Sequence, residues 1–216
     1  MKMLFHPDGP VFRLLARAAE LMALNVCFLL CCLPVFTIGA SVTALYASLF
    51  LRQDGGTVRR FFREFRRNFR QGVALGLILG AIGGVLLADY QLLGQLDGGY
   101  AAIKYLLYLA AITWVGVSSF AFGLLARFEN TVGRILKNAL LLSFSMLSRT
   151  VLMVLIDAAP LLLLLFAPDW FGRSFILWLL LGFAVCAQLK VWVLKDVFSS
   201  LPGNAGKREG EEETAN

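Results

Sequence analysis

The chain has 216 residues, of which 59% are hydrophobic and 16% charged, with a net charge of +6 and a mean hydropathy of +0.75. Soluble domains carry about 25% charged residues, so this composition excludes an ordinary soluble protein and indicates an integral membrane protein with several spans. The basic residues lie between apolar segments. We therefore expect them to meet a lipid bilayer with anionic headgroups rather than nucleic acid.

A short head and a long apolar block open the chain. The head, residues 1–17, includes PVFRLLARAA from residue 10, whose apolar and arginine faces predict a helix lying in the membrane interface. Residues 18–50 would form a helix of about 50 Å, too long for a hydrocarbon core of about 30 Å. Because Pro34 interrupts this block, we expect one span kinked at Pro34. A re-entrant hairpin of two half-helices is the alternative.

The segment 59–70, RRFFREFRRNFR, places phenylalanines on one arc of a helix and arginines on the opposite arc. It predicts an amphipathic interfacial helix in a cytoplasmic loop, with phenylalanines toward the acyl chains and arginines at phosphates. A docking helix for a cytoplasmic partner is the alternative. The predicted headgroup or docking residues are Arg59, Arg60, Arg63, Arg66, Arg67 and Arg70, and the predicted interfacial apolar residues are Phe61, Phe62, Phe65 and Phe69.

Four further apolar segments follow, and together with the first block they predict an all-α, polytopic membrane helical bundle of about five transmembrane helices. We expect a single transmembrane domain over 18–200, a second amphipathic stretch at 127–149, a turn at 167–173 and a disordered polar tail at 201–216. The further spans are predicted at 72–96, 100–126, 150–166 and 174–198. In the first of these, Gly72, Gly76, Gly80 and Gly84 share a face, which favours close helix packing or self-association into a homo-oligomer.

Basic residues predict the topology. The 52–71 loop carries seven Lys and Arg residues and the 127–149 loop four, against two in the turns between the other spans. The positive-inside rule therefore places both long loops, and the C-terminus, in the cytoplasm. Five spans would place the head outside, whereas Lys2, Arg13 and Arg17 favour a cytoplasmic head. A re-entrant first block would remove this conflict, and the sequence leaves both arrangements open.

Three polar residues lie inside predicted spans: Asp157 in the fourth, and Gln188 and Lys190 in the fifth. Polar and ionisable groups at membrane depth are costly and therefore mark functional hypotheses. Since the fourth and fifth spans are antiparallel neighbours, Asp157 and Lys190 lie at similar depths and can pair. The pair is either a structural salt bridge or part of a substrate or ion pathway.

The chain shows no pattern for catalysis or metal binding. Its single histidine, His6, lies in the head, and its four cysteines lie in apolar stretches, where they behave as small buried hydrophobes. No CxxC, HExxH or phosphate-binding loop is present in the sequence. We therefore expect no cofactor, no metal and no enzymatic activity.

Two motifs carry a family resemblance. The run LPVFTIGASVTALYASL at 33–49 and the run FFREFRRNFRQG at 61–72 resemble the YesL family of bacterial integral membrane proteins, in which a Leu-Pro-x-x-Thr-x-Gly stretch precedes Thr-Ala-Leu-Tyr and a phenylalanine-asparagine motif. The matching positions are Leu33, Pro34, Thr37, Gly39, Thr43, Ala44, Leu45, Tyr46, Phe61, Phe65, Asn68 and Phe69.

The resemblance implies a multi-pass protein of the bacterial cytoplasmic membrane, and it supplies no known activity and no catalytic residues. It also implies a place beside carbohydrate transporter subunits or a membrane sensor kinase. We therefore expect a non-enzymatic accessory or regulatory membrane component linked to carbohydrate uptake. A small transporter or permease-like protein with an intramembrane polar pathway is the alternative, which Asp157, Lys190 and the break at Pro34 favour.

Overall fold

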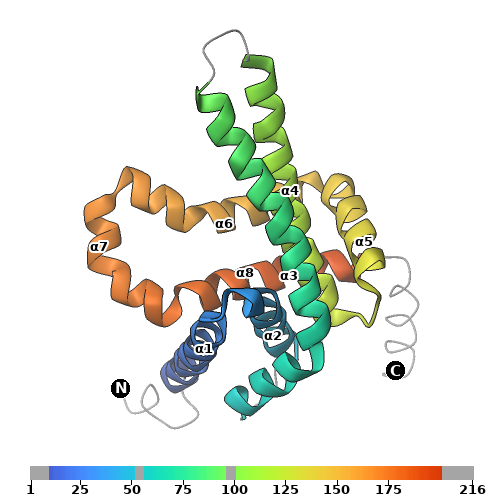
Figure 1. Cartoon of the computed structure of the whole chain (residues 1–216). Helices are drawn as coiled ribbons and strands as arrows, with labels where there is room; N and C mark the ends of the chain where they lie inside the picture. Colours follow the sequence, from blue (N-terminus) through green and yellow to red (C-terminus); the bar gives the residue numbers. More distant parts are fainter. Residues whose placement is uncertain (1–9, 52–55, 96–100, 201–216) are drawn as a thin grey trace.

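The computed structural model describes residues 10–51, 56–95 and 101–200, and every regular element in these ranges is a helix (Figure 1). The predicted start of the head and the predicted polar tail lie outside the described residues. In chain order the elements are α1 (Pro10–Cys32), the 3-10 turn η1 (Val35–Thr37), α2 (Ile38–Phe50), α3 (Thr57–Gln95), α4 (Ala101–Arg127), α5 (Val132–Ser145), α6 (Leu147–Phe166), α7 (Pro168–Leu177), the π-helical segment η2 (Trp178–Gly182) and α8 (Phe183–Ser199).

Five helical segments of the described chain are long and apolar enough to cross a membrane. The predicted all-α polytopic fold is therefore confirmed. The five segments are Val11–Cys32, Thr57–Leu93, Ala102–Arg127, Leu147–Phe166 and Gly172–Ser199.

The first apolar block differs from the predicted single span kinked at Pro34. It forms a hairpin, in which α1 includes the predicted interfacial helix and has 23 residues, whereas α2 has only 13. Helix α1 ends at Cys32 because a residue that precedes proline, here Leu33, is disfavoured in the α conformation. Thr37 Oγ1 donates a hydrogen bond to the Cys31 carbonyl at 2.5 Å, which satisfies an acceptor at the helix end.

The hairpin returns the chain to the side from which it came. One pocket is lined by Leu14 from the start of α1, Leu49 from the end of α2 and Thr57 from the start of α3. These three helix ends therefore lie together, so the chain enters and leaves the hairpin at the same end of the bundle. The hairpin tip carries large exposed apolar side chains, which are Leu33, Val35, Phe36 and Ile38.

Helix α2 is the centre of the fold. Every residue from Thr43 to Phe50 is buried, and α2 packs against α1, α3, α4 and α8. A helix that is apolar around its whole circumference requires such surroundings. Because 13 residues rise only about 20 Å, α2 is too short to cross a membrane and instead serves as the core that the longer helices enclose.

Small residues let α2 and α3 approach closely. A Cβ atom placed on Gly39 would lie 2.2 Å from the Gly72 carbonyl oxygen, and one placed on Gly76 would lie 2.9 Å from the Gly39 Cα. By contrast, a Cβ atom on Gly80 or Gly84 would have no neighbour within 4 Å. The predicted glycine face is therefore divided: its first half packs within the bundle, and its second half lies open because α2 begins only at Ile38.

Helix α3 runs unbroken for 39 residues, so the predicted interfacial helix at 59–70 and the predicted span at 72–96 are one element. At 1.5 Å per residue it is about 58 Å long, roughly twice the hydrocarbon thickness. Figure 1 shows its first turns crossing the lower end of the molecule before the helix rises beside α4. Trp114 of α4 donates from Nε1 to the Leu79 carbonyl of α3 at 3.0 Å, which links the two helices.

The C-terminal half also has more helix than expected. Only Ala167 separates α6 from α7, so the predicted turn at 167–173 is wrong. Pro168 explains the difference, because proline is favoured at the first position of a helix. Arg149 at the start of α6 forms an ion pair with Asp196 near the end of α8, in keeping with an antiparallel arrangement of the two helices.

A buried asparagine ties α1 to the π-helical segment. Asn25 is 0% exposed, accepts a hydrogen bond from the Ala184 N–H at 2.8 Å and donates to the Leu179 carbonyl at 2.7 Å. Its amide thus bridges two backbone groups around η2. The sequence motifs gave no sign of this π-helical segment.

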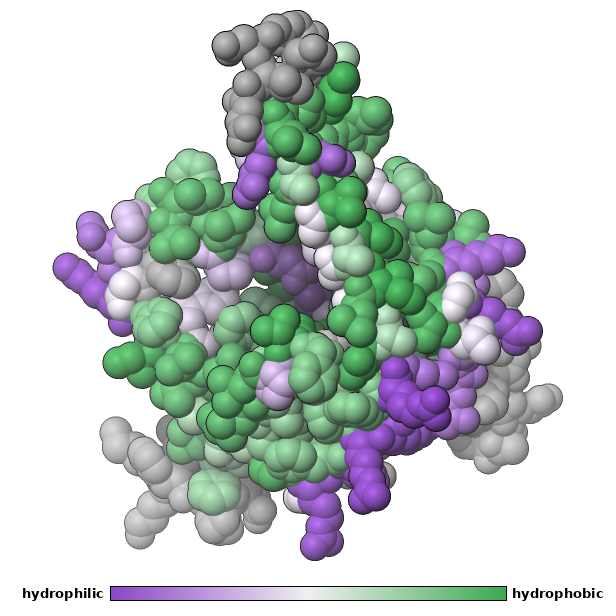
Figure 2. Space-filling view, in the orientation of Figure 1, coloured by the Kyte–Doolittle hydropathy of each residue, from purple (hydrophilic) through white to green (hydrophobic). Residues whose placement is uncertain are grey.

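The surface is largely apolar. Figure 2 shows hydrophobic residues over most of the visible face, with hydrophilic residues gathered at its lower right and at its outer edges. Large exposed apolar patches mark contact with other molecules or with a membrane. Because five of the helices can also cross a bilayer, the chain is a multi-pass membrane protein.

Candidate functional site

The predicted intramembrane charges form one polar cluster at the centre of the bundle. Lys190 Nζ lies 2.5 Å from Asp157 Oδ1, so α8 and α6 share an ion pair. Ser119 of α4 donates to Asp157 Oδ2 at 2.7 Å, and the Lys190 ammonium lies 5.6 Å from the centroid of the Tyr46 ring of α2. Four helices therefore contribute to the cluster.

This cluster is protected and internally satisfied. The side chain of Lys190 is 12% exposed and that of Asp157 is 32% exposed. Asp157 lies about 12 Å along α6 from Arg149, whose own ion pair joins the same two helices nearer to their ends. Because the pair is partly buried, removing one partner leaves a poorly solvated charge without its counter-ion, which is destabilising. The geometry is that of an inter-helix brace between α6 and α8.

Gln188 does not join this cluster. It lines a separate pocket together with Arg17 and Arg60. Sequence reasoning also missed Ser119 and Tyr46 as members of the cluster. Tyr46 lies in the quoted Thr-Ala-Leu-Tyr segment, and Ser119 is one of the polar residues of an apolar span. Both features are visible in the sequence, but neither predicts a contact with Asp157 or Lys190.

A basic cleft lies between α3 and the connection from α4 to α5. Its volume is about 820 Å³. Arg67 pairs with Glu129 at 2.5 Å, and the Gln71 side chain donates to the Asn130 carbonyl at 3.2 Å, so two contacts hold the cleft walls together. The residues lining the cleft are Arg66, Arg67, Asn68, Arg70, Gln71, Ala74, Glu129, Asn130, Thr131, Val132 and Arg134.

The cleft carries more positive charge than its own carboxylate balances. Within the described part of the chain, no carboxylate pairs with Arg66, Arg70 or Arg134. Hydrophilic residues also dominate the lower right of the molecule in Figure 2, beside the first half of α3 and α5. An anionic group entering the cleft would therefore meet three arginines that have no carboxylate partner there.

Two residues of the 59–70 segment depart from the predicted arrangement. Arg60 is 7% exposed and donates to the Ser48 carbonyl of α2 at 3.4 Å, and Phe61 is 0% exposed in the core. Their placement as headgroup and acyl-chain contacts is therefore wrong. The physical reason is α2, which covers this side of the first turns of α3.

The remaining phenylalanines lie at different depths. Phe62 is 47% exposed, whereas Phe65 and Phe69 are only partly exposed. The rings of Phe61 and Phe65 stack with centroids 6.3 Å apart, and those of Phe65 and Phe69 lie 5.4 Å apart. The stripe therefore begins as a packing seam against the core, and Phe62 lies beside it at the surface.

Glu64 lies among the arginines of this segment, and the sequence pattern did not identify it as a site residue. It is 3% exposed and lies within 3.4 Å of Arg63 and 3.7 Å of Arg67. Arg59 and Arg63 remain exposed on the outer side of the segment, away from the residues that line the basic cleft. The segment therefore has a buried side, a cleft side and an exposed basic side.

Residues 21–90 match the family model described as a protein of unknown function, DUF624. The matched stretch contains the second half of α1, all of α2 and most of α3, and therefore both motifs quoted from the sequence. No curated protein and no solved structure matches the chain.

Proposed function

We propose that this protein is a non-enzymatic accessory component of the bacterial cytoplasmic membrane, and that its basic cleft docks an acidic segment of a cytoplasmic or membrane partner. The observation that carries the proposal is the group of arginines in that cleft, Arg66, Arg70 and Arg134, which no described carboxylate neutralises. Charge complementarity of this kind favours specific association with an acidic surface.

The shape of the cleft supports a protein partner. Its walls come from two segments separated by about 60 positions in the chain, and the Arg67–Glu129 and Gln71–Asn130 contacts fix their spacing. A concave site with fixed walls selects a side chain or short segment, whereas a lipid surface requires only a basic face. The exposed Arg59 and Arg63 provide such a face, and in this proposal they meet anionic headgroups.

The family resemblance indicates which partners to test first. Carbohydrate transporter subunits and membrane sensor kinases are the two classes that it implies. In this proposal the cleft lies on the cytoplasmic side, as the excess of arginine and lysine in the two long loops predicts. The open glycines of α3, Gly80 and Gly84, leave self-association as an additional mode of assembly.

A transporter-like function is the second candidate, and the Asp157–Lys190 cluster is the observation that favours it. Both residues belong to helical segments that are long and apolar enough to cross a membrane, and charges in such segments commonly mark an ion or substrate route. However, Gln188 lines a different pocket, so the three predicted pathway residues do not share one cavity in this conformation. Proton or solute flux in proteoliposomes that Asp157→Asn abolishes would favour this candidate over the docking proposal.

Site-specific photo-crosslinking tests the docking proposal. A photoreactive residue at Ala74, which lines the cleft, should capture one defined protein in cells. The same residue at Leu77, which is 57% exposed one turn further along α3, is the matched control and should capture lipid. Loss of the Ala74 product after Arg66→Gln and Arg70→Gln would support docking. Capture of lipid alone from both positions would refute it.

A further inference from the structure

The basic cleft lies close to the point where α8 ends. Phe198, in the last turn of α8, has its ring 5.3 Å from the ring of Phe128, and Phe128 immediately precedes Glu129 in the cleft wall. Figure 1 shows α8 passing behind α3 and α4 toward the side where α5 lies. Ser200, which follows α8, is exposed. The chain therefore leaves the bundle beside the cleft.

The sequence that follows α8 contains a dense acidic cluster. Residues 209–213 read EGEEE, so four glutamates lie within five positions. Nowhere else in the sequence do two acidic residues lie within five positions of each other. Electrostatic complementarity favours the association of such a cluster with a group of unneutralised cations. The acidic segment 209–213 is therefore the part of this chain whose charge best matches a group of arginines.

The connection between α8 and the acidic segment is long enough to reach the cleft. The nine residues from Ser200 to Glu209 span at most about 30 Å when fully extended. The ring contact between Phe198 and Phe128 places the cleft wall well inside that span from the end of α8. Chain length therefore allows the acidic segment to enter the cleft, and the charge of the cleft decides whether it does.

The cleft presents the complementary charge. Arg66, Arg70 and Arg134 line it, all three are exposed, and no carboxylate of the described chain pairs with them. Its volume of about 820 Å³ is large enough for several side chains of an extended segment. Arginine and carboxylate groups form charge-assisted hydrogen bonds, which are often bidentate. Several glutamates of one segment can therefore each meet a different arginine.

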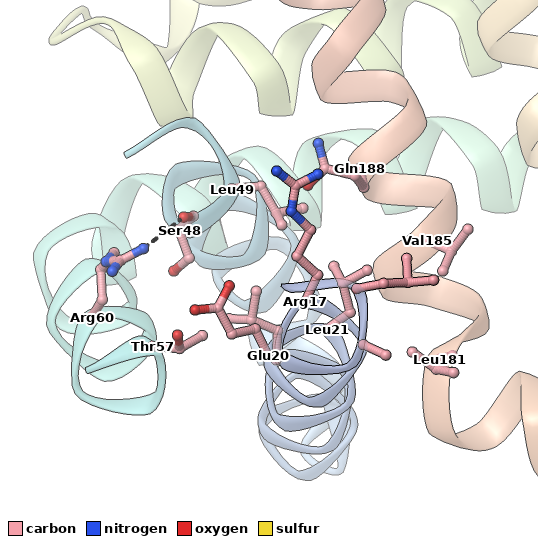
Figure 3. A pocket seen from close by; sticks show the side chains of 13 residues that line it. Arg17, Glu20, Leu21, Ser48, Leu49, Thr57, Arg60, Leu181, Val185 and Gln188 are labelled. Atoms are coloured by element: carbon pink, nitrogen blue, oxygen red, sulfur yellow. Dashed lines mark hydrogen bonds between the residues drawn. The ribbon is translucent and has the colours of Figure 1, made fainter. Parts of the chain in front are cut away.

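The other pocket that contains arginines suits the acidic segment less well. It lies where α1, α2, α3 and α8 meet, and Figure 3 shows Glu20 there together with Arg17 and Arg60. The Glu20 carboxylate repels further glutamates, and Arg60 already donates to a carbonyl of α2 at 3.4 Å. In the basic cleft, by contrast, Arg67 neutralises the Glu129 carboxylate. The charge balance therefore favours the basic cleft.

We infer that the acidic segment 209–213 occupies the basic cleft when no partner is bound there. The inference rests on the proposed docking function, because it makes this segment an internal competitor for the arginines that would hold the partner. A segment tethered at this distance has an effective concentration of about 1 mM. An affinity of only about 1 mM would therefore keep the cleft about half occupied. A partner must displace the segment before it docks.

Photo-crosslinking of the purified full chain tests the contact in the absence of any partner. A photoreactive residue at Ala74, in the cleft wall, should form a crosslink to residues 209–213 of the same molecule, which peptide mapping detects. Sodium chloride at 1 M should suppress the crosslink, because it screens exposed charges. Mixing isotopically labelled and unlabelled protein distinguishes a crosslink within one molecule from a crosslink between two.

Two tail variants provide the comparison. The first replaces all four glutamates by glutamine and should lose the crosslink; its changes are Glu209→Gln, Glu211→Gln, Glu212→Gln and Glu213→Gln. The matched control, Lys207→Gln with Arg208→Gln, changes the charge of the same tail without touching the acidic segment and should keep the crosslink. A thermal melt checks that both variants remain folded. In cells, capture of the partner at Ala74 should rise about twofold or more in the four-glutamine variant.

The outcomes separate this inference from the docking proposal. A crosslink within one molecule, together with increased partner capture in the four-glutamine variant, would support the inference. No crosslink to residues 209–213, or a crosslink only between two molecules, would overturn it and would leave docking intact if Ala74 still captures a partner in cells. Unchanged partner capture in the four-glutamine variant would also overturn it. Capture of no protein by either wild type or the four-glutamine variant would refute docking itself, and with it the competition.

Discussion

The close contact between α2 and α3 supports a quantitative prediction. Adding one methyl group by Gly72→Ala would place a Cβ atom 2.6 Å from the Ala40 Cα and 3.0 Å from the Ala40 nitrogen. Ordinary contact begins near 3.4 Å, so the two backbones must separate by about 0.8 Å or the helices must rotate. Since α2 is the buried centre of the bundle, the change affects its packing against α1, α4 and α8 as well.

The matched control is Gly80→Ala, two turns further along the same helix. A Cβ atom there would have no neighbour within 4 Å. Both changes gain the same helix propensity, about 0.5–1 kcal/mol, which cancels in the comparison. Overpacking costs about 1–3 kcal/mol, so Gly72→Ala should be less stable than Gly80→Ala by about that amount.

Reversible unfolding in mixed micelles, followed by tryptophan fluorescence as the denaturing detergent fraction rises, measures this difference. Gly80→Ala should unfold at the wild-type midpoint or slightly above it, and Gly72→Ala clearly below it. Equal midpoints for the two variants would refute the close approach of α2 and α3. A lower midpoint for Gly80→Ala alone would instead locate the important glycine contact at the open end of the face.

Three further predictions concern the interior and the topology. Asp157→Asn should lower the unfolding free energy by about 1–3 kcal/mol, since the pair is only partly buried, and adding Lys190→Met should recover much of this loss, because the double variant leaves no unpaired charge. An additive double variant would contradict a direct pair. Asn25→Leu should cost about 2–3 kcal/mol in the same assay, because it leaves the Leu179 carbonyl and the Ala184 N–H without their side-chain partner. Reporters fused to the two ends of the chain should both give a cytoplasmic signal, because the α1–α2 hairpin returns to its starting side. Signals from opposite sides of the membrane would instead support a single span kinked at Pro34.

The sequence was most informative where a property extends over many residues. Apolar length predicted the spanning helices, and antiparallel order brought Asp157 and Lys190 to one depth. Both inferences need only helix geometry and the cost of charge in hydrocarbon. Neither depends on knowing which residues pack against which.

It was least informative where another segment decides the environment. Periodicity correctly gave the 59–70 segment an arginine side and a phenylalanine side, but it could not show that α2 covers Arg60 and Phe61. Pro34 correctly predicted where the helix of the first block breaks. It did not predict whether the chain continues across the bundle or turns back. Both errors have one origin: α2 is too short to be recognised as a span, yet it occupies the centre of the bundle.

The most direct test of the docking proposal compares two pairs of charge removals on the same helix. Arg66→Gln with Arg70→Gln changes the cleft, whereas Arg59→Gln with Arg63→Gln removes the same charge from exposed positions outside it. Quantitative crosslinking and purification from native membranes should recover the partner with wild type and with the Arg59 and Arg63 variant, and lose it only with the cleft variant. Equal loss of the partner in both variants would indicate that the segment serves only as a membrane anchor. Equal recovery of the partner in both variants would show that the cleft does not dock it.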